Sequence, residues 1–366
     1  MLSVREVSGK RVRIKKLNNL FSRVSMHERI EFARNLGSML EAGLTVTRSL
    51  AVFEKQTRNA SFKAILSSIR DKIEKGARLS DALKEYPKVF SALFTSMTHA
   101  GEESGSLSES LRSVAVQMEQ VYQLRKKIRG AMTYPIIVFS VMILVGVVML
   151  TYVVPALSGT FKELHIELPT STKIIVGISD FMSNNFILTI LIIIGTVSAF
   201  VSGLRTRLGK RAFEYVLLHT PIIATLVRET NSARTARTLS SLLTAGVEVI
   251  DALQITQDVV QNSYFKKVLQ DAKKEIQTGA PIAQVFERAE HLYPPFVAEM
   301  VAVGEETGSL STMLVHVADF YENEVGRKTK DMSTIIEPFL MVIIGAAVGF
   351  FAVSMIQPIY SISSGI

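Results

Sequence analysis

The chain contains no cysteine among its 366 residues, which excludes disulfides and thiolate-bound metals. Signatures of a phosphate-binding loop, a zinc hydrolase and a serine nucleophile elbow are also missing, and the six histidines are scattered along the sequence. The first twenty residues are basic but hold no apolar core, so we expect no cleavable signal peptide. These absences disfavour an enzyme, and we expect neither catalytic residues nor a cofactor.

Charged residues are missing from three long stretches. No Asp, Glu, Lys or Arg lies between Arg129 and Lys162, within residues 181–204, or after Glu337. Each stretch exceeds the roughly 20 residues that a membrane-spanning helix requires. We therefore predict spans at residues 131–156, 181–204 and 336–358. Because ion carriers usually place ionisable residues inside the membrane, these uncharged spans disfavour a transporter or channel subunit, which is our alternative function.

The basic residues are distributed unevenly around these spans. Of the 41 Lys and Arg, 24 precede the first span, 15 lie between the second and third spans, and only Lys162 and Lys173 lie elsewhere. By the positive-inside rule, the amino terminus is cytoplasmic and the carboxyl terminus is outside. Much of the net charge of +8 lies in residues 1–30, 125–129 and 205–211. We interpret it as attraction to membrane lipids rather than to nucleic acid, although a membrane-bound nucleic-acid tether is a further alternative.

The sequence repeats itself at an offset of 203 residues. Residues 97–107 and 300–310 are identical at seven of eleven positions. The same offset, without gaps, also pairs positions from both ends of the unit: Arg34 with Arg237, Gly76 with Gly279, Pro135 with Pro338 and Pro155 with Pro358. A period this long indicates a duplicated domain. The second span belongs to neither copy and returns the chain to the cytoplasm, so the two copies are parallel.

Apolar residues recur at three and four positions through both cytoplasmic stretches. We predict an all-α membrane protein with two homologous cytoplasmic six-helix bundles and three transmembrane helices. The predicted order is a basic N-terminal segment (1–25), a first bundle (26–130), a first span (131–156), an extracytoplasmic loop (157–180), a second span (181–204), a second bundle (205–335), a third span (336–358) and an extracytoplasmic C-terminus (359–366).

A repeated acidic turn is the most specific candidate site. It comprises Gly101, Glu102, Glu103 and Gly105 in the first copy, and Gly304, Glu305, Glu306 and Gly308 in the second. Its structural interpretation is a hinge, in which both glycines turn the chain between two helices and the glutamates lie near a helix start. Its functional interpretations are contact with a partner protein or a cation site, because neighbouring carboxylates supply hard oxygen ligands.

Residues of the spans form a second set of candidates. Gly345 and Gly349 form a Gly-x-x-x-Gly stripe in the third span, where another helix can approach closely, from this chain or from another copy. Pro135 and Pro338 occupy equivalent positions near the start of the first and third spans. We expect Glu337 to lie at the membrane surface, at the amino terminus of a helix.

Several motifs together resemble one family. They are FARNLGSMLEAG at 32–43, TYP at 133–135, LP at 168–169, EPFL at 337–340 and the two GEE-x-G elements. The sequence resembles the type II secretion F / type IV pilus PilC family of inner-membrane platform proteins, from about residue 25 onwards. The resemblance implies a non-enzymatic platform in the bacterial inner membrane that forms homo-oligomers. It also implies binding to a cytoplasmic hexameric assembly ATPase, to pilin or pseudopilin and to other inner-membrane assembly proteins. Pili, secretion and DNA uptake all use this architecture.

Overall fold

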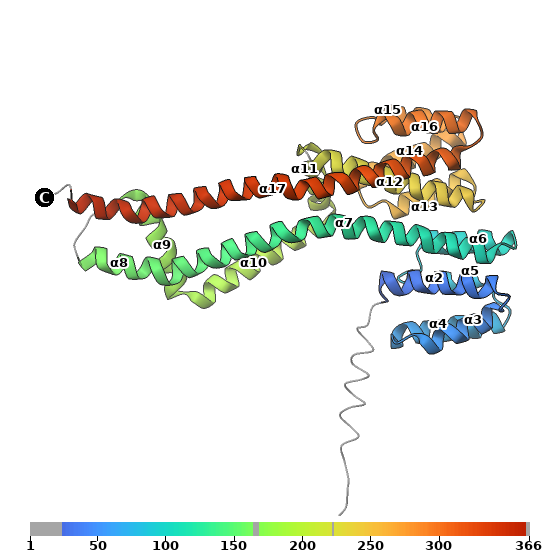
Figure 1. Cartoon of the computed structure of the whole chain (residues 1–366), viewed down its shortest axis with the longest axis horizontal. Coiled ribbons are helices and arrows are strands. Elements are labelled where there is room, and N and C mark those ends of the chain that lie inside the picture. Colours follow the sequence, from blue (N-terminus) through green and yellow to red (C-terminus); the bar gives the residue numbers. More distant parts are fainter. Residues whose placement is uncertain (1–23, 164–167, 222, 364–366) are drawn as a thin grey trace, which may run out of the picture. The chain divides into compact units, whose positions relative to one another are not determined.

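The computed structural model describes the fold of residues 24–163, 168–221 and 223–363, and these residues contain helices and no strand (Figure 1). The predicted all-α class is therefore confirmed. Almost all of the basic segment 1–25, and the last residues of the segment 359–366, lie outside the described residues.

The first bundle is formed by α2 (Met26–Glu41), α3 (Val46–Gln56), α4 (Ala60–Glu74), α5 (Leu79–Lys84), α6 (Ala92–Glu103) and the first part of α7 (Leu107–Val148). Its helix starts carry side chains that accept backbone hydrogen bonds. Ser25 and Glu28 form a reciprocal capping box at α2, and Asn59 caps α4. The core is a cluster of phenylalanine rings: Phe32, Phe53, Phe62, Phe90 and Phe94. Each buried ring contributes about 1.5–3 kcal/mol to folding.

The second bundle repeats this order with α12 (Ile223–Thr244), α13 (Val249–Val259), α14 (Ser263–Gln277), α15 (Ile282–Arg288), α16 (Pro295–Glu306) and the first part of α17 (Leu310–Ser363). Its core differs at four of the five phenylalanine positions, since only Phe265 retains the phenylalanine of its counterpart Phe62. Thr235 and Tyr293 stand where the first copy has Phe32 and Phe90, and their side-chain oxygens are 3.1 Å apart. Because Tyr293 is fully buried, its pKa is raised above the ordinary value.

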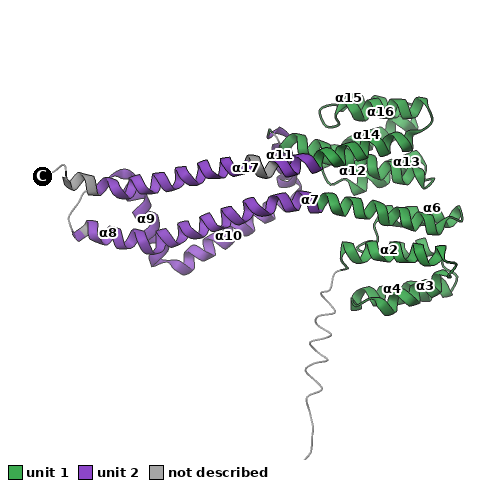
Figure 2. Cartoon of the chain, in the orientation of Figure 1, with its two compact units in different colours: residues 1–125, 221–325 green, residues 126–220, 326–366 purple. Residues whose placement is uncertain are grey.

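The two bundles pack together into one compact unit, made of residues up to 125 and residues 221–325 (Figure 2). Helix α6 contacts α12 and α13. The side chain of Gln117 on α7 contacts α12 through Thr238, at 3.4 Å, and Ser241, at 2.9 Å. The duplicated halves therefore share an interface that the sequence pattern does not reveal.

The second compact unit contains residues 126–220 and 326–366. It holds the ends of α7 and α17 and the helices α8 (Val154–Glu163), α9 (Thr170–Asn184), α10 (Phe186–Arg205) and α11 (Arg207–His219). In the part of the chain that the structure describes, three helices are long and apolar enough to cross a membrane: Leu107–Phe161, Phe186–Arg205 and Leu310–Pro358. These match the three predicted spans, although residues 181–184 belong to α9 rather than to the second span.

Two predictions about this unit are corrected by the structure. The stretch 157–180, predicted as a loop, contains most of α8 and the first part of α9. Glu337, predicted at a helix amino terminus, is exposed well inside α17, because that helix runs without interruption from the second bundle into the third span. Pro135 and Pro338 likewise lie inside α7 and α17.

Helix α9 connects the far ends of the first and third spans. Val154, Ile175, Val176 and Met355 form a buried apolar cluster. Pro155 and Pro358 have no backbone N–H, so each leaves the carbonyl four residues earlier without its helical donor. The hydroxyls of Ser183 and Thr172 on α9 donate to these carbonyls, Thr151 O at 3.4 Å and Ser354 O at 2.5 Å. The Ser179 hydroxyl donates to Leu150 O at 2.6 Å, in the π-helical turn Met149–Val153 that precedes Pro155.

Candidate functional site

The first acidic turn caps a helix within its own bundle. The carboxylate of Glu102 accepts hydrogen bonds from the backbone N–H groups of Leu79, at 2.6 Å, and Ser80, at 3.0 Å, and from the Ser80 hydroxyl. These N–H groups belong to the first turn of α5, where a helix has no internal acceptors and favours negative charge. Glu102 therefore attaches the end of α6 to the start of α5.

The second copy reproduces this cap. The carboxylate of Glu305 accepts from the N–H groups of Ile282, at 2.7 Å, and Ala283, at 2.8 Å, at the start of α15. These donors are 203 positions after Leu79 and Ser80. The sequence provided a signal for this role, because Arg78 and Pro281, which precede the two short helices, supply no side-chain cap. The helix starts therefore require an acceptor from elsewhere in the chain.

The second glutamate of each turn faces outward. Glu103 is 58% exposed and lies 3.6 Å from Arg78 and 3.4 Å from His99. Glu306 is also exposed. Exposed pairs of this kind contribute little to stability. Within the described residues, no group of three or more His, Asp or Glu side chains is arranged to hold a metal ion. Glu103 and Glu306 are therefore accessible to a partner from solvent.

The glycines of the turns have two different roles. Gly105 and Gly308 have φ of 72° and 66° and turn the chain, a conformation that glycine adopts at no steric cost. Gly101 and Gly304, expected to be turn glycines too, lie inside α6 and α16. A Cβ atom on Gly101 would lie 2.4 Å from Ser110 Cβ, and one on Gly304 would lie 2.8 Å from the Cα of Leu310. The first glycine of each turn therefore permits close helix packing.

An ion pair is also duplicated. Arg34 on α2 lies 3.4 Å from Glu119 on α7, and Arg237 on α12 lies 2.9 Å from Glu322 on α17. Arg237 is mostly buried and also pairs with Asp319. Burial disfavours its charged form, but the hydrogen bonds to Glu322 and Asp319 outweigh this effect, so its pKa is raised. The pairs fix the first helix of each bundle against the last one.

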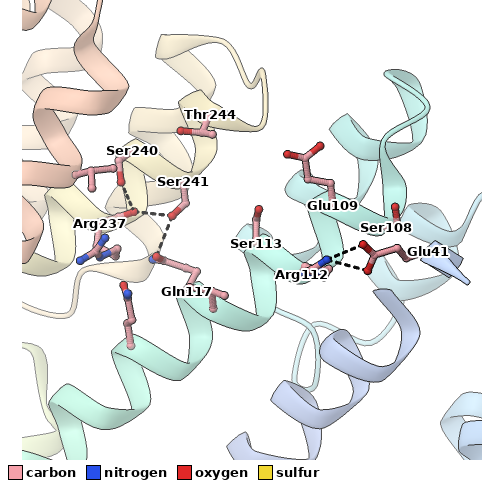
Figure 3. Close-up of a pocket in the computed structure, with 13 residues that line it drawn as sticks. Glu41, Ser108, Glu109, Arg112, Ser113, Gln117, Arg237, Ser240, Ser241 and Thr244 are labelled. Atoms are coloured by element: carbon pink, nitrogen blue, oxygen red, sulfur yellow. Dashed lines mark hydrogen bonds and ion pairs between the residues drawn. The ribbon is translucent and has the colours of Figure 1, made fainter. Parts of the chain in front are cut away.

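A polar cavity of about 660 Å³ lies where the two bundles meet (Figure 3). Gln117 reaches Ser241 on one side, while Arg112 makes two 2.8 Å contacts with the Glu41 carboxylate on the other. The cavity is lined mainly by hydroxyl, amide and carboxylate groups and by two arginines that are already paired, Arg112 and Arg237. The charges of both arginines are therefore compensated by carboxylates of the same chain.

The two glycines of the third span, Gly345 and Gly349, have no side chain or backbone of another described helix packed against them. A Cβ atom added at Gly345 or Gly349 would meet no heavy atom within 4 Å. A separate apolar cavity of about 480 Å³ is lined by α7 and α17, with Met142, Gly146 and Ala347 among its residues. Within the described residues, the glycine stripe thus has no helix packed against it, and this leaves it open to another chain.

The fold defines a helical protein built from two copies of a bundle, each of which leads into a helix long and apolar enough to cross a membrane. Comparison with known proteins specifies the class. The family model for type II secretion system (T2SS), protein F matches residues 32–155 and again residues 235–358. The chain belongs to this family, and the two matches coincide with the two copies of the repeat.

Curated relatives carry names from two systems. The type IV pilus assembly protein PilC of Thermus thermophilus is 38% identical over 331 residues, which cover 90% of this chain and 81% of the relative. PilC of Myxococcus xanthus is 35% identical over 346 residues, or 94% of this chain and 83% of the relative. Type II secretion system protein F of Aeromonas hydrophila is 30% identical over 366 residues, or 99% of this chain and 94% of the relative.

Proposed function

We propose that this chain is the inner-membrane platform of a type IV pilus or type II secretion machine. In this role it receives a cytoplasmic hexameric assembly ATPase and couples its motion to the insertion of pilin or pseudopilin subunits into a filament. The observation that carries the proposal is the double family match, each copy of which covers a helical bundle and the span that follows it. The relatives named for pilus assembly support a role in a type IV pilus, and those named for secretion support a role in a type II secretion machine.

The continuity of two helices supports the coupling. Helix α7 runs from Leu107 to Val148 and α17 from Leu310 to Ser363, so each bundle supplies the first part of a helix that continues into the membrane. A continuous α-helix transmits displacement along its axis better than a flexible linker does. A motor that shifts the cytoplasmic bundles would therefore also shift the first and third spans.

A platform requires no catalytic centre of its own, because the partner hydrolyses ATP. The first glutamate of each acidic turn caps a helix, and the arginines of the polar cavity are paired with carboxylates. Within the acidic turns, Glu103 and Glu306 are the exposed carboxylates, and we assign them to contact with the motor. The apolar cavity between α7 and α17 is a surface for a membrane-embedded subunit.

We further propose that both bundles face the cytoplasm, that the carboxyl terminus is outside, and that copies of the chain associate through the Gly345 and Gly349 stripe. The 39-to-2 division of basic residues supports the orientation. The open surroundings of the two glycines support the association.

The proposal is tested by deleting the gene and by purifying the tagged full-length chain from native membranes. Deletion is expected to abolish filaments or secretion, and the tagged chain is expected to copurify with a hexameric ATPase and with pilin or pseudopilin. A chain carrying charge-reversing changes at Glu103 and Glu306 should retain pilin but lose the ATPase. Solute flux through the purified chain in vesicles, with filament assembly intact in the deletion strain, would instead establish the transporter alternative.

A further inference from the structure

Helix α11 (Arg207–His219) exposes its apolar side and buries a side that carries a glutamate. Leu208, Val216 and Tyr215 are 84%, 57% and 51% exposed, whereas Glu214 and Leu218, on a different side of the helix, are each 7% exposed. A helix on the surface of a soluble protein normally buries its apolar stripe and turns its charged side to water. The arrangement on α11 is reversed, so the described part of the chain does not cover its apolar side.

The exposed apolar residues form one stripe. Leu208, Ala212, Tyr215 and Val216 follow one another at intervals of four, three and one, which places them on one face of an α-helix. All four are exposed, and Phe213 beside them is 44% exposed. Single exposed apolar side chains are normal on a protein surface, but a contiguous stripe marks a contact with lipid or with another protein.

The position of α11 in the chain favours lipid. Helix α10, which is the second candidate span, ends at Arg205, and α11 begins at Arg207 after the single residue Thr206. Thr206 has an extended backbone, and its hydroxyl oxygen accepts a hydrogen bond from the Gly209 N–H at 3.1 Å. It therefore ends one helix and caps the next. The amino terminus of α11 thus lies at the depth where the second span leaves the bilayer.

Helix α11 is grouped with the spans but is too short to be one. It belongs to the compact unit of residues 126–220 and 326–366, which contains the spans, and not to the unit that contains both bundles (Figure 2). Its 13 residues extend about 20 Å, which is less than the bilayer's apolar core of about 30 Å. Lys210 and Arg211 also interrupt its apolar sequence. The helix is therefore suited to lie along the membrane surface rather than to cross it.

The charges beside the stripe fit an anionic lipid surface. Residues 205–214 contain four basic residues and one acidic residue. Arg211 lies one helical turn from both Leu208 and Tyr215, at the border of the stripe. Long basic side chains lay their methylene groups along apolar surface while their charge reaches the headgroups. Tyrosine favours the same depth, because its ring is apolar and its hydroxyl is polar.

We propose that α11 is an interfacial helix that lies on the surface of the bilayer, with Leu208, Ala212, Tyr215 and Val216 inserted among the lipids and its basic residues close to anionic headgroups. The stripe is thus covered by lipid and not by a protein. This surface is separate from the contacts proposed for the motor and the filament subunit, and it fixes the depth at which the second span ends.

The test uses the absence of cysteine from the chain, because a single introduced cysteine then carries the only label. Leu208→Cys and Val216→Cys are made in the full-length chain, spin-labelled and reconstituted into nanodiscs of phosphatidylcholine and phosphatidylglycerol. Collisions of each label are measured by electron paramagnetic resonance with oxygen, which concentrates in the bilayer, and with a neutral nickel chelate, which stays in water. Both labels should meet oxygen and be shielded from nickel, because an interfacial helix buries its apolar side about 5–10 Å into the headgroup boundary.

Val116→Cys is the matched control. Val116 on α7 is 57% exposed, as Val216 is, but it belongs to the compact unit of the bundles and lies well before the predicted span that starts at residue 131. Its label should meet the nickel chelate freely, so the ratio of oxygen to nickel collisions should be higher at 208 and 216 than at 116. Thermal unfolding of each variant checks that the chain keeps its wild-type stability, which is expected because all three positions are exposed.

Two results overturn the proposal. A label at 216 that meets nickel as freely as the label at 116 does would place the stripe in water, whatever the label at 208 shows, since 208 lies next to the span. Labels at 208 and 216 that meet neither oxygen nor nickel would place the stripe under protein. A disulfide-linked dimer of the unlabelled Leu208→Cys chain would then identify a second copy of this chain as the cover.

Discussion

Replacing Glu102 with glutamine should destabilise the first bundle even though the side chain keeps its size. The Glu102 carboxylate accepts hydrogen bonds from two backbone N–H groups and one hydroxyl at the start of α5. Glutamine retains one oxygen, but its amide NH₂ would face a backbone N–H that also donates. The variant therefore loses the negative charge and at least one accepted hydrogen bond.

The expected cost follows from these contacts. One hydrogen bond to a charged group contributes about 1.5–3 kcal/mol, and loss of a helix cap costs about 1 kcal/mol. These overlap, because they describe the same bonds, so we expect a loss of about 2 kcal/mol. For a unit of this size, each kcal/mol corresponds to about 2–4 °C, which gives a decrease of about 4–8 °C in Tm. Glu305→Gln should produce a similar decrease, because Glu305 makes the equivalent bonds.

The assay is thermal unfolding of the full-length chain in detergent, followed by circular dichroism and checked by pulse proteolysis. Glu103→Gln and Glu306→Gln are the matched controls: they make the same chemical change at adjacent exposed positions. Exposed ion pairs contribute about 0–1 kcal/mol, so both controls should unfold within about 4 °C of the wild type and above the Glu102→Gln variant. Their effect, if any, should appear in copurification of the ATPase.

The reasoning fails if Glu102→Gln unfolds at the wild-type temperature, or if Glu103→Gln lowers Tm more than Glu102→Gln does. Either outcome would mean that the cap on α5 is not formed by the Glu102 carboxylate. A double variant with Glu102→Gln and Glu305→Gln should show nearly additive losses, because the two caps lie in different bundles and share no partner.

Three further predictions concern the membrane unit. Reporter fusions after residues 125, 165, 325 and 366 should read inside, outside, inside and outside, and an inside reading after 366 would remove the third span. Gly345→Leu with Gly349→Leu should reduce crosslinked oligomers while the cytoplasmic bundles stay folded, because leucine blocks close backbone approach; unchanged oligomers would refute the contact. Ser179→Ala with Thr172→Val should lower thermal stability by about 1 kcal/mol in total, since each change removes one hydrogen bond to a helix carbonyl, whereas an unchanged Tm would show that these bonds contribute nothing.

The amino-acid sequence alone indicated the helical class, the three spans and the duplication. These features depend on local composition and periodicity: an uncharged run of 24 residues such as 181–204 predicts a membrane helix wherever it occurs. The structure of the segment between the first and second spans was harder to predict. Residues 157–180 were expected to form a loop between the first and second spans, but the structure shows most of α8 and the start of α9 there. Contacts between α9 and the ends of two spans stabilise a helix there, whereas the local sequence pattern does not distinguish a helix from a loop.

The candidate sites, too, were predictable from the sequence only in part. The acidic turns were visible as a repeated motif, but their chemistry depends on residues more than twenty positions earlier, since Glu102 bonds Leu79 and Glu305 bonds Ile282.

Composition and spacing thus determined which segments are helical, which of them enter the membrane and how the chain is duplicated, because these properties follow from interactions between neighbours in sequence. Only the tertiary structure decided which glutamate of each pair caps a helix, which glycine packs and which turns, and which carboxylates pair with the buried Arg237. Those outcomes depend on which helix ends and faces meet in space, and a charge is stabilised or destabilised by the groups around it rather than by its position in the chain.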